Sequence, residues 1–423
     1  MQTIHVIGGG LSGLSAALSL SQAGRAVVVH EAGPAAGGRC RSYFDRELGI
    51  RVDNGNHLML SGNRAVLAYL RETGAEDRVR IADRPVFPFR DLKTGVRWSL
   101  RPNRGRLPWW VLRPGRRVPD TGLADYLAMG RIVRIRDDTP VAEAMPHSRL
   151  YERLVEPLAI AALNTPPRTG LARLLAAVMR ETLMVGGHTC RPILPLEGLS
   201  EAMVDPAVAT LRRRGAEVRL NSRIAELVLA EGSVTALRGP DGSIPGSIPL
   251  GPADGVVLAV PPWVAADLLP GLTAPTAFEA ILNLHFRHEA DPAGPLGETG
   301  FIGLIGGTAE WLFRKPGHVS VTISAANALV DETPAALAGK VWTDVAAALD
   351  LPAPTPMPPF RVVKEKRATF AATAEQDRRR PGPRTALAAN LAVAGDWTDT
   401  GLPATIEGAI RSGRTAANLL LSR

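Results

Sequence analysis

Short apolar runs and one Ala- and Leu-rich stretch alternate along the first thirty residues. Thr3 to Ile7 (TIHVI) predicts a buried strand, and the LSAALSLSQ stretch further on has the spacing of a helix, which Gly24 closes. Ala26 to His30 (AVVVH) predicts a second strand. The order of strand, glycine-rich turn, helix and strand indicates a βαβ unit and an α/β fold.

The same buried-strand pattern returns in the middle and at the end of the chain. Residues 216–238 read as alternating strands, and Gly255 to Val260 and Leu391 to Ala394 read as short buried strands. An amphipathic helix begins around Thr405 and Ile406. We therefore expect a discontinuous nucleotide-binding domain and an α+β substrate-binding domain. The first comprises residues 1–75, 200–265 and 385–423, and the second comprises residues 76–199 and 266–384.

The turn after the first strand has the residues of a dinucleotide site. Gly8, Gly10 and Gly13 satisfy G-x-G-x-x-G, whose glycines give a tight turn, close approach to a pyrophosphate and close helix packing. The following helix points its positive end at the phosphates. Glu31 ends the second strand, where a carboxylate can accept hydrogen bonds from a ribose. The predicted contacts are Gly8, Gly10, Leu11, Ser12, Gly13 and Glu31.

The segment after Glu31 distinguishes one dinucleotide from another. It reads AGPAAGGRCRS, which resembles the extended fingerprint of glutathione-reductase-like FAD proteins, a group that includes amine oxidases, protoporphyrinogen oxidase and phytoene desaturases. The resemblance implies FAD as cofactor and a discontinuous glutathione-reductase-like Rossmann domain. The further FAD contacts that it implies are Gly38, Arg39, Gly55, Asn56, Ile224, Gly395, Asp396, Thr405 and Ile406.

The C-terminal motif completes this expected FAD site. In the resembling proteins the Gly-Asp pair binds the ribityl and pyrophosphate, and the next helix points at the flavin pyrimidine, where its dipole stabilises negative charge. Ile224 marks the segment whose backbone would contact the adenine. Glu407, in the first turn of the helix, fits a residue that complements the helix dipole, and we assign it no catalytic role.

Four stretches resemble one narrower family, the hydroxysqualene dehydroxylases, which are squalene-associated FAD-dependent proteins of bacterial hopanoid pathways. The stretches are VDNGNHLML (52–60), EPLAIAALNTPP (156–167), KRATFAATAEQDRRRP (366–381) and GDWTDTGLPATIEGAIRSG (395–413). The resemblance implies a net reduction, in which the hydroxyl of hydroxysqualene leaves as water and a hydride from reduced FAD replaces it. Such a reaction needs a dry apolar cavity and an acid that assists the departure of water.

Polar residues in these motifs are the candidates for that acid. His57 is the first candidate, because a histidine near its ordinary pKa can donate a proton at neutral pH. Asp399 is the second, and Asn164 could orient the leaving hydroxyl. We interpret Asp53 as a residue that stabilises its own tight turn, and Asp396 as a cofactor ligand.

Composition and charge fit a cytoplasmic enzyme that meets a membrane. The chain has 423 residues, 45% hydrophobic and 21% charged, which suits two soluble domains. Its net charge of +8 favours anionic surfaces, but we find neither a clustered basic stripe nor a nucleic-acid-binding module. Two cysteines and the absence of a signal peptide indicate the cytoplasm. RLPWWVLRPGRR (106–117) predicts peripheral association with the anionic inner face of the membrane, where a C30 isoprenoid substrate resides.

Other functions remain open at this stage. A desaturase of a polyprenoid such as phytoene would run the redox chemistry in the opposite direction, and an amine oxidase would cage its substrate with aromatic residues, for which four tyrosines are few. A prenyl-binding chaperone would share the fold without a working flavin site. No second G-x-G-x-x-G follows a strand, so a separate flavin reductase could supply the electrons. The repeated GSIP in DGSIPGSIPLG (241–251) is interpreted as a duplication at a hairpin tip.

Overall fold

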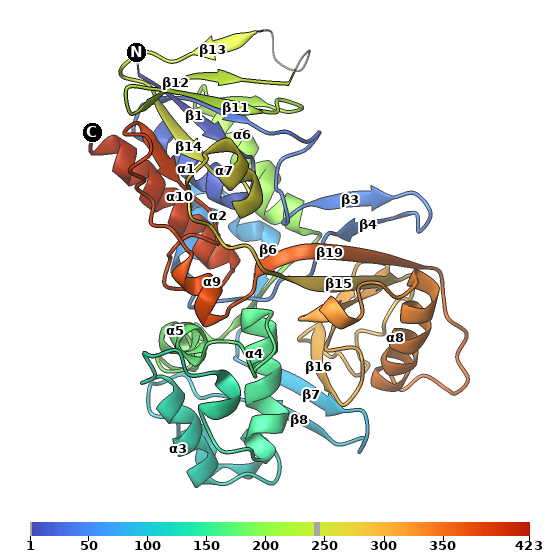
Figure 1. Cartoon of the computed structure of the whole chain (residues 1–423). Helices are drawn as coiled ribbons and strands as arrows, with labels where there is room; N and C mark the ends of the chain where they lie inside the picture. The colour runs from blue at the N-terminus through green and yellow to red at the C-terminus, as the bar shows by residue number, and fades with distance from the viewer. Residues whose placement is uncertain (1, 241–245) are drawn as a thin grey trace.

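The computed structural model describes residues 2–240 and 246–423, so the first GSIP copy (242–245) lies outside the described residues. Two units are stacked end to end, with both chain termini at the far end of the upper unit in Figure 1. The upper unit contains the N-terminal, central and C-terminal segments, and the lower unit contains the segments between them. This arrangement agrees with the expected discontinuous domain.

A five-stranded parallel sheet forms the centre of the upper unit, and every neighbouring pair in it is parallel. Its strands are, in order, β10 (Glu217–Arg219), β2 (Ala26–His30), β1 (Thr3–Ile7), β14 (Gly255–Leu258) and β20 (Leu391–Val393). All are strands that the apolar pattern predicted. Because β1 and β20 lie in one parallel sheet, the glycine turn after β1 and the Gly395–Asp396 pair after β20 leave the sheet at the same carboxyl edge, which is the ligand edge of such folds.

Two helices from opposite ends of the chain pack against each other beside this sheet. They are α1 (Leu11–Gln22) and α10 (Ile406–Leu421). A Cβ atom on Gly413 would lie 2.1 Å from the carbonyl oxygen of Ser12, so only glycine permits this approach. The Ser15 hydroxyl also donates to the carbonyl of Ile410 at 2.9 Å. The remaining helices of the unit are α2 (Arg64–Thr73), α6 (Asp205–Arg213) and α7 (Pro262–Leu268).

The lower unit is built on a seven-stranded mixed sheet. Its strands are, in order, β19 (Phe360–Phe370), β15 (Phe278–Phe286), β18 (His318–Ile323), β17 (Trp311–Lys315), β16 (Phe301–Ile305), β7 (Phe87–Asp91) and β8 (Arg97–Leu100). Helix α8 (Pro334–Ala348) covers one face through an aliphatic core that includes Leu282, Leu284 and Val341, all fully buried. The opposite face is the one that concerns function.

Helices and small sheets complete the fold. The helices are α3 (Leu123–Ile132), α4 (Glu156–Leu163), α5 (Ala172–Glu181) and α9 (Ala374–Arg378). The small sheets contain β3 (Ser42–Asp45) with β4 (Ile50–Asp53), β5 (Met59–Leu60) with β9 (Pro192–Pro195) and β6 (Val79–Ile81), and β11 (Glu226–Ala230) with β12 (Ser233–Arg238) and β13 (Ser247–Pro249). None of the helices in the described residues is long and apolar enough to cross a bilayer.

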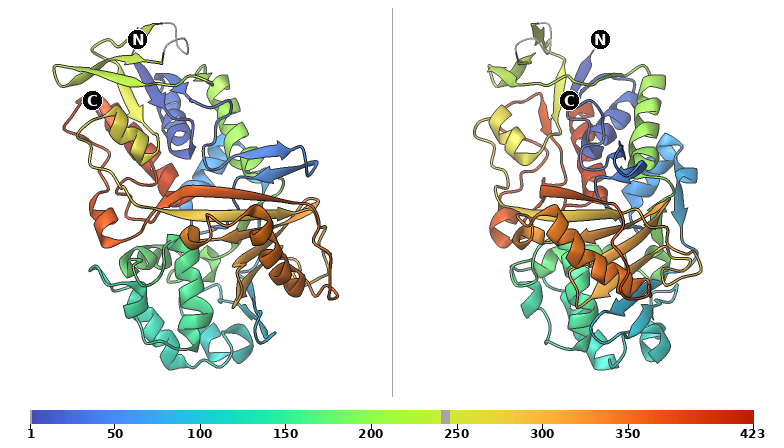
Figure 2. Two further views of the ribbon diagram at one scale, coloured as in Figure 1. Left: turned by 45° about the vertical axis from the view of Figure 1, so that its right-hand side comes forward. Right: turned by 90° about the vertical axis from the view of Figure 1, so that its right-hand side faces the viewer.

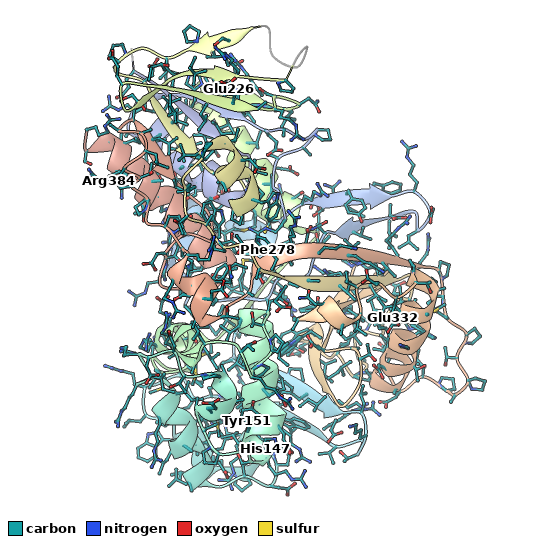
Figure 3. The ribbon with its side chains drawn as sticks, viewed as in Figure 1. His147, Tyr151, Glu226, Phe278, Glu332 and Arg384 are labelled. Carbon is teal, nitrogen blue, oxygen red and sulfur yellow. The ribbon has the colours of Figure 1, made fainter. Side chains whose placement is uncertain are left out.

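Strands β15 and β19 run along the junction between the two units (Figures 1 and 2). At the start of β15, Phe278 lies in the middle of the molecule (Figure 3) and meets the Trp263 ring edge-on, with ring centroids 5.1 Å apart. The guanidinium of Arg367, from β19, lies 4.8 Å from the Trp263 ring centroid. These contacts join the junction strands to α7 of the upper unit.

Candidate functional site

The turn between β1 and α1 contains two glycines that the fold requires, Gly8 and Gly13, and one that faces open space, Gly10. Cβ atoms on Gly8 and Gly13 would lie 2.4 Å from the Ala259 carbonyl oxygen and 2.0 Å from the Gly8 carbonyl oxygen, respectively. Gly8 also has a φ of +107°. Gly10 has an ordinary φ of −73°, and a Cβ there would meet nothing within 4 Å. The fold itself does not require glycine at position 10, so the residue fits a ligand that lies directly against the turn.

The first turn of α1 offers donors to that ligand. No side chain caps this helix at Gly10. Among the described residues, no hydrogen bond engages the backbone N–H groups of Leu11 and Ser12. Unpaired N–H groups at a positive helix end suit the phosphates of a dinucleotide.

Glu31 is held at the other end of this predicted dinucleotide site. Its carboxylate accepts hydrogen bonds from the N–H of Gly9 at 2.8 Å and the N–H of Gly33 at 2.7 Å. The adjoining segment is tied to β2, because the N–H of Ser222 donates to the Glu31 carbonyl at 2.8 Å. Ile224 follows Ser222 by two residues, and its side chain is buried. Among the described residues no hydrogen bond involves its backbone N–H or C=O. A free backbone pair there fits the predicted contact to an adenine.

The Gly37–Gly38 doublet lies directly on the glycine turn. The Gly37 N–H donates to the Gly9 carbonyl at 2.8 Å, and both Gly37 and Gly38 have positive φ values, +112° and +56°. A Cβ on Gly38 would lie 3.5 Å from the Cα of Gly10. The two glycine motifs therefore form one backbone surface, as the predicted FAD fingerprint requires.

Arg39 joins the N-terminal motif to the C-terminal one. Its guanidinium pairs with the Asp396 carboxylate at 2.7 Å and also donates to the Ala368 carbonyl of β19. Asp396 is 7% exposed, so its charge needs this partner. Gly395 is sterically required, because a Cβ there would lie 2.3 Å from the indole nitrogen of the buried Trp397.

Helix α10 begins at the predicted position, and Glu407 has a wider role than the predicted one. Thr405 caps the helix, accepting from the Gly408 N–H at 3.0 Å. The buried Glu407 carboxylate accepts hydrogen bonds from the N–H groups of Ala65 at 3.0 Å and Val66 at 2.9 Å, at the start of α2. Glu407 therefore caps a second helix as well as complementing the dipole of its own.

The prediction that Asp53 stabilises its own turn is wrong. Its carboxylate accepts from the Ser42 hydroxyl at 2.7 Å and the Leu199 N–H at 2.9 Å, and it pairs with Lys315 Nζ at 2.8 Å. Asp53 and Lys315 side chains are only 4% and 9% exposed. Despite burial, these partners hold the pKa of Asp53 below its usual value. Asp53 thus fixes the loop that contains Gly55, Asn56 and His57 to the lower unit.

Asn56 connects the same loop to the face of the seven-stranded sheet opposite α8. Its amide nitrogen donates to the Ser320 hydroxyl at 2.7 Å and the Thr322 hydroxyl at 3.1 Å. The amide oxygen is buried and has no hydrogen-bond partner in the described residues. An orphaned acceptor beside the flavin motifs fits a site that is completed by a bound group.

Strand register divides this face of the sheet into a polar and an aromatic half. Directly paired residues share a face, so His285 and Asn283 lie beside Ser320 and Thr322, which pair with Phe313 and Trp311. The face continues through Phe301, Phe89 and Trp98. The polar half meets Asn56, and the aromatic half, in which Phe89 stacks on Trp98 with centroids 5.6 Å apart, extends away from it.

The reason for choosing His57 as an acid does not hold in the structure. Burial lowers the pKa of His57 to about 4, and the nearby cations Arg39 and Lys315 lower it further, against the opposing effect of Asp53 and Asp396. The imidazole is therefore neutral at pH 7. Among the described residues no hydrogen bond engages its ring nitrogens.

The other two candidate residues differ in their surroundings. Asp399 is exposed, and its backbone N–H donates to the Pro381 carbonyl at 2.9 Å, whereas no partner of its carboxylate is found among the described residues. Asn164 is 3% exposed, and its amide is occupied by Thr369 at 2.9 Å, the Glu279 carbonyl at 3.2 Å and the Ala325 N–H at 2.6 Å. Asn164 therefore ties α4 to the sheet, and its amide is not free to orient a hydroxyl.

Sequence reasoning missed Arg380. The buried guanidinium donates to the Leu402 carbonyl at 2.8 Å, to the Thr400 hydroxyl at 3.1 Å and to the Thr398 carbonyl, and it pairs with Asp377 at 2.8 Å. It holds the loop between Asp396 and α10 in place. Its position in the KRATFAATAEQDRRRP stretch was the only signal, because the three consecutive arginines cannot be distinguished by sequence.

Both cysteines are buried free thiols. Burial raises the pKa of Cys40 and of Cys190 to about 12 in each case. They remain protonated at neutral pH, and neither is a nucleophile there.

Comparison with known proteins agrees with this geometry. The model of the flavin containing amine oxidoreductase family matches residues 11–291 and 302–421. The chain is 48% identical to a hydroxysqualene dehydroxylase of Sinorhizobium fredii and 47% identical to one of Rhodopseudomonas palustris, over 100% of this chain and 99% of each relative.

Two more distant similarities are to a solved structure with the same fold and to a desaturase. The crystal structure of a putative protoporphyrinogen oxidase from Exiguobacterium has a TM-score of 0.69 at 16% identity, covering 100% of this chain and 99% of that one. A 15-cis-phytoene desaturase of Arabidopsis thaliana is 26% identical over 63% of this chain and 49% of its own length. The similarity to the dehydroxylases thus exceeds that to the desaturase in both identity and extent.

Proposed function

The chain belongs to the flavin containing amine oxidoreductase family and, within it, to the hydroxysqualene dehydroxylases, and from this premise we propose how its residues carry out the reaction. The enzyme replaces the hydroxyl of hydroxysqualene with hydride and releases squalene and water. The observation that carries this conclusion is the 48% identity over both full lengths, with the FAD motifs of both chain ends brought together by the Arg39–Asp396 ion pair. The desaturase alternative rests only on the distant similarity.

The two glycine motifs and the first turn of α1 would hold the FAD pyrophosphate, with Glu31 at the ribose. Gly395 and Asp396 would hold the ribityl side, and the N-terminus of α10 would face the flavin pyrimidine. Reduced FAD supplies the hydride when bound. The polypeptide contributes position and charge, since the Arg39 guanidinium and two helix N-termini face this region.

The face of the seven-stranded sheet opposite α8 would receive the substrate. Its polar half, next to Asn56, suits the hydroxyl-bearing carbons, and its aromatic half suits the hydrocarbon chain. Aromatic faces also stabilise positive charge, which develops as water departs from an allylic carbon. The Phe301 and Phe313 rings, 6.1 Å apart, and Trp311 contribute to this wall.

We assign the proton chemistry to His57 and Asp399, but with roles that differ from those expected from the sequence. The neutral His57 imidazole would hydrogen-bond the leaving hydroxyl without being an acid in its own right, because its pKa of about 4 leaves it uncharged. Asp399 remains the candidate for a group that relays a proton from solvent, since its side chain is exposed.

We further propose that the enzyme works at the inner face of the cell membrane and receives electrons from a separate flavin reductase. The apolar C30 substrate and the basic charge of +8 support the first proposal. The single G-x-G-x-x-G after a strand supports the second, because it leaves no second dinucleotide motif for a nicotinamide cofactor.

The experiment that tests the function is product analysis. Purified protein, hydroxysqualene and chemically reduced FAD are incubated without oxygen, and the extract is analysed by gas chromatography with mass detection. Squalene that forms only with reduced flavin supports the proposal. A yellow, flavin-loaded protein that gives no squalene but oxidises a polyprenoid would overturn it in favour of desaturation.

A further inference from the structure

The net positive charge of the protein is concentrated in one segment of the chain. Residues 101–136 contain nine arginines and no lysine, against the acids Asp120 and Asp125, which gives +7 (9 − 2) out of a total of +8. The other 387 residues (423 − 36) therefore carry a net charge of only +1 (8 − 7). This differs from the expectation that no clustered basic stretch exists.

None of these nine arginines forms a salt bridge within the described part of the chain, although arginines elsewhere, such as Arg39 and Arg380, are paired. Two of the nine donate to backbone carbonyls while half-buried, Arg116 to Arg101 at 2.9 Å and Arg117 to Val111 at 2.7 Å. The exposed ones are Arg101, Arg104, Arg106, Arg113, Arg131, Arg134 and Arg136. This segment is thus a cluster of uncompensated cations in the monomer.

The same segment exposes large apolar side chains. Seven large hydrophobic side chains in the described chain are at least half exposed, and five of them lie here. They are Leu107 (63%), Trp109 (63%), Leu112 (55%), Leu123 (50%) and Leu127 (63%). A monomeric soluble protein rarely exposes so many large apolar side chains on one segment, and such exposure marks a surface that contacts a protein or a membrane.

These side chains project from an ordered base. Trp109 is exposed, whereas its neighbour Trp110 is 3% exposed and meets Tyr126 of α3 edge-on, with ring centroids 5.1 Å apart. The Asn103 side chain accepts from the Trp110 N–H at 3.2 Å and donates to the Leu107 carbonyl at 2.8 Å. The 3₁₀ helix Trp109–Leu112 and α3 are thereby held together.

The position of this segment in the fold also suits contact with a surface. In every view the segment around α3 lies at the end of the molecule opposite the nucleotide-binding unit (Figures 1 and 2). His147 and Tyr151, which follow it in the chain, are seen at this end in Figure 3. An approach of a flat surface to this end would leave the predicted flavin motifs uncovered.

We propose that residues 101–136 form a docking surface for an anionic lipid bilayer, with Leu107, Trp109 and Leu112 entering the interface and the exposed arginines meeting the headgroups. This inference rests on the proposed function, whose substrate is a membrane-resident isoprenoid, and it names the surface through which the enzyme meets that membrane. Aromatic and leucine side chains rimmed by arginine suit the boundary between headgroups and acyl chains. A nucleic acid would explain the arginines but not the five exposed apolar side chains.

The test uses the full-length, FAD-loaded enzyme and lipid vesicles of two compositions, neutral phosphatidylcholine alone or with 30% phosphatidylglycerol. Flotation measures the bound fraction at low and high salt. We expect binding to the anionic vesicles that falls with salt, because each arginine near such a surface contributes about fivefold in affinity. Equal binding to neutral vesicles, or none to either, would overturn the proposal.

Two pairs of variants locate the surface. W109E/L112E should weaken vesicle binding at least tenfold, whereas F44E, at a side chain that is 61% exposed on β3, should not. R106Q/R113Q should weaken it roughly 25-fold, as two contributions of about fivefold, whereas R46Q/R223Q, at exposed arginines outside the segment, should not. Equal effects of test and control variants would contradict the assignment.

Activity and assembly measurements separate the remaining alternatives. With hydroxysqualene in detergent micelles the W109E/L112E variant should keep wild-type turnover, and with hydroxysqualene in anionic vesicles it should lose it. Loss in both would contradict docking as the role of these residues, and wild-type enzyme inactive in both would refute the function itself. A dimer that W109E/L112E dissociates, or a DNA duplex that displaces the vesicles by binding more tightly, would replace the bilayer with another occupant and overturn the proposal.

Discussion

Substitution of Gly10 by alanine separates the fold from the cofactor site. The fold accommodates the new methyl group, because Gly10 has a φ of −73° and a Cβ there meets nothing within 4 Å. Loss of a glycine also reduces the freedom of the unfolded chain, which stabilises a protein by about 0.4–1 kcal/mol. The flavin-free G10A variant should therefore unfold at or roughly 1–3 °C above the wild-type temperature.

The same methyl group should remove FAD. It projects into the space where the dinucleotide would approach the turn, and it would hold the pyrophosphate away from the N–H groups of Leu11 and Ser12. Two hydrogen bonds to a charged group contribute about 1.5–3 kcal/mol each, and each 1.4 kcal/mol corresponds to a factor of ten. The dissociation constant for FAD should rise by roughly 10²–10⁴.

The assay combines the flavin absorbance of the purified protein, titration of the apoprotein with FAD and thermal unfolding without FAD. G339A in α8 is the matched control, since a Cβ there also meets nothing within 4 Å and the residue is remote from the motifs. G13A is the contrast, because its Cβ would lie 2.0 Å from the Gly8 carbonyl oxygen and should destabilise the apoprotein itself. A G10A protein that binds FAD as tightly as wild type would refute the assignment of this turn.

Further predictions concern buried charge. K315M should destabilise the enzyme by about 3–5 kcal/mol, because it leaves the buried Asp53 carboxylate without its cationic partner. The double variant D53N/K315M should recover part of this loss, and additive losses in thermal unfolding would contradict the coupling between the two residues. H57Q should leave the pH dependence of turnover between pH 6 and 8 unchanged, since the pKa of His57 is about 4, and the disappearance of an ionisation in that range would show that His57 titrates there. Burial raises the pKa of Glu310 from its usual 4.5 to about 7, so its contribution to stability is full below pH 4.5 and is lost as the pH rises through 7. E310Q should therefore exceed wild type in stability at pH 8.5, by up to about 3 kcal/mol, and match it at pH 4.5; a constant difference in denaturant unfolding across this range would argue against a neutral Glu310.

Local periodicity was sufficient to predict the nucleotide-binding layer. Thr3–Ile7 and Ala26–His30 are β1 and β2 with the predicted limits, and α10 begins at Ile406 with Thr405 as its cap. These elements are specified by neighbours in sequence, since apolar spacing, glycines and capping residues act within a few positions. The meeting of the two chain ends could be inferred because both carry motifs for the same ligand.

Residues whose roles depend on distant partners could not be assigned in this way. Asp53 looks like a turn residue until Lys315 and Leu199 are brought to it. Glu407 caps a helix more than 300 residues earlier in the chain. His57 has an ordinary pKa in an unfolded chain, and only burial beside two cations lowers that pKa to about 4. Burial and long-range charge, which the sequence pattern does not encode, decide these roles.

The reaction itself is tested most directly by one turnover in deuterium oxide. Enzyme loaded with reduced FAD is mixed with hydroxysqualene without oxygen, and the hydrocarbon product is analysed by mass spectrometry, with G10A as the flavin-free control. Transfer of hydrogen from a reduced flavin equilibrated with the solvent predicts squalene that carries one deuterium, in an amount equal to the bound flavin. Unchanged substrate, or a product with additional double bonds formed by the oxidised enzyme, would contradict the account.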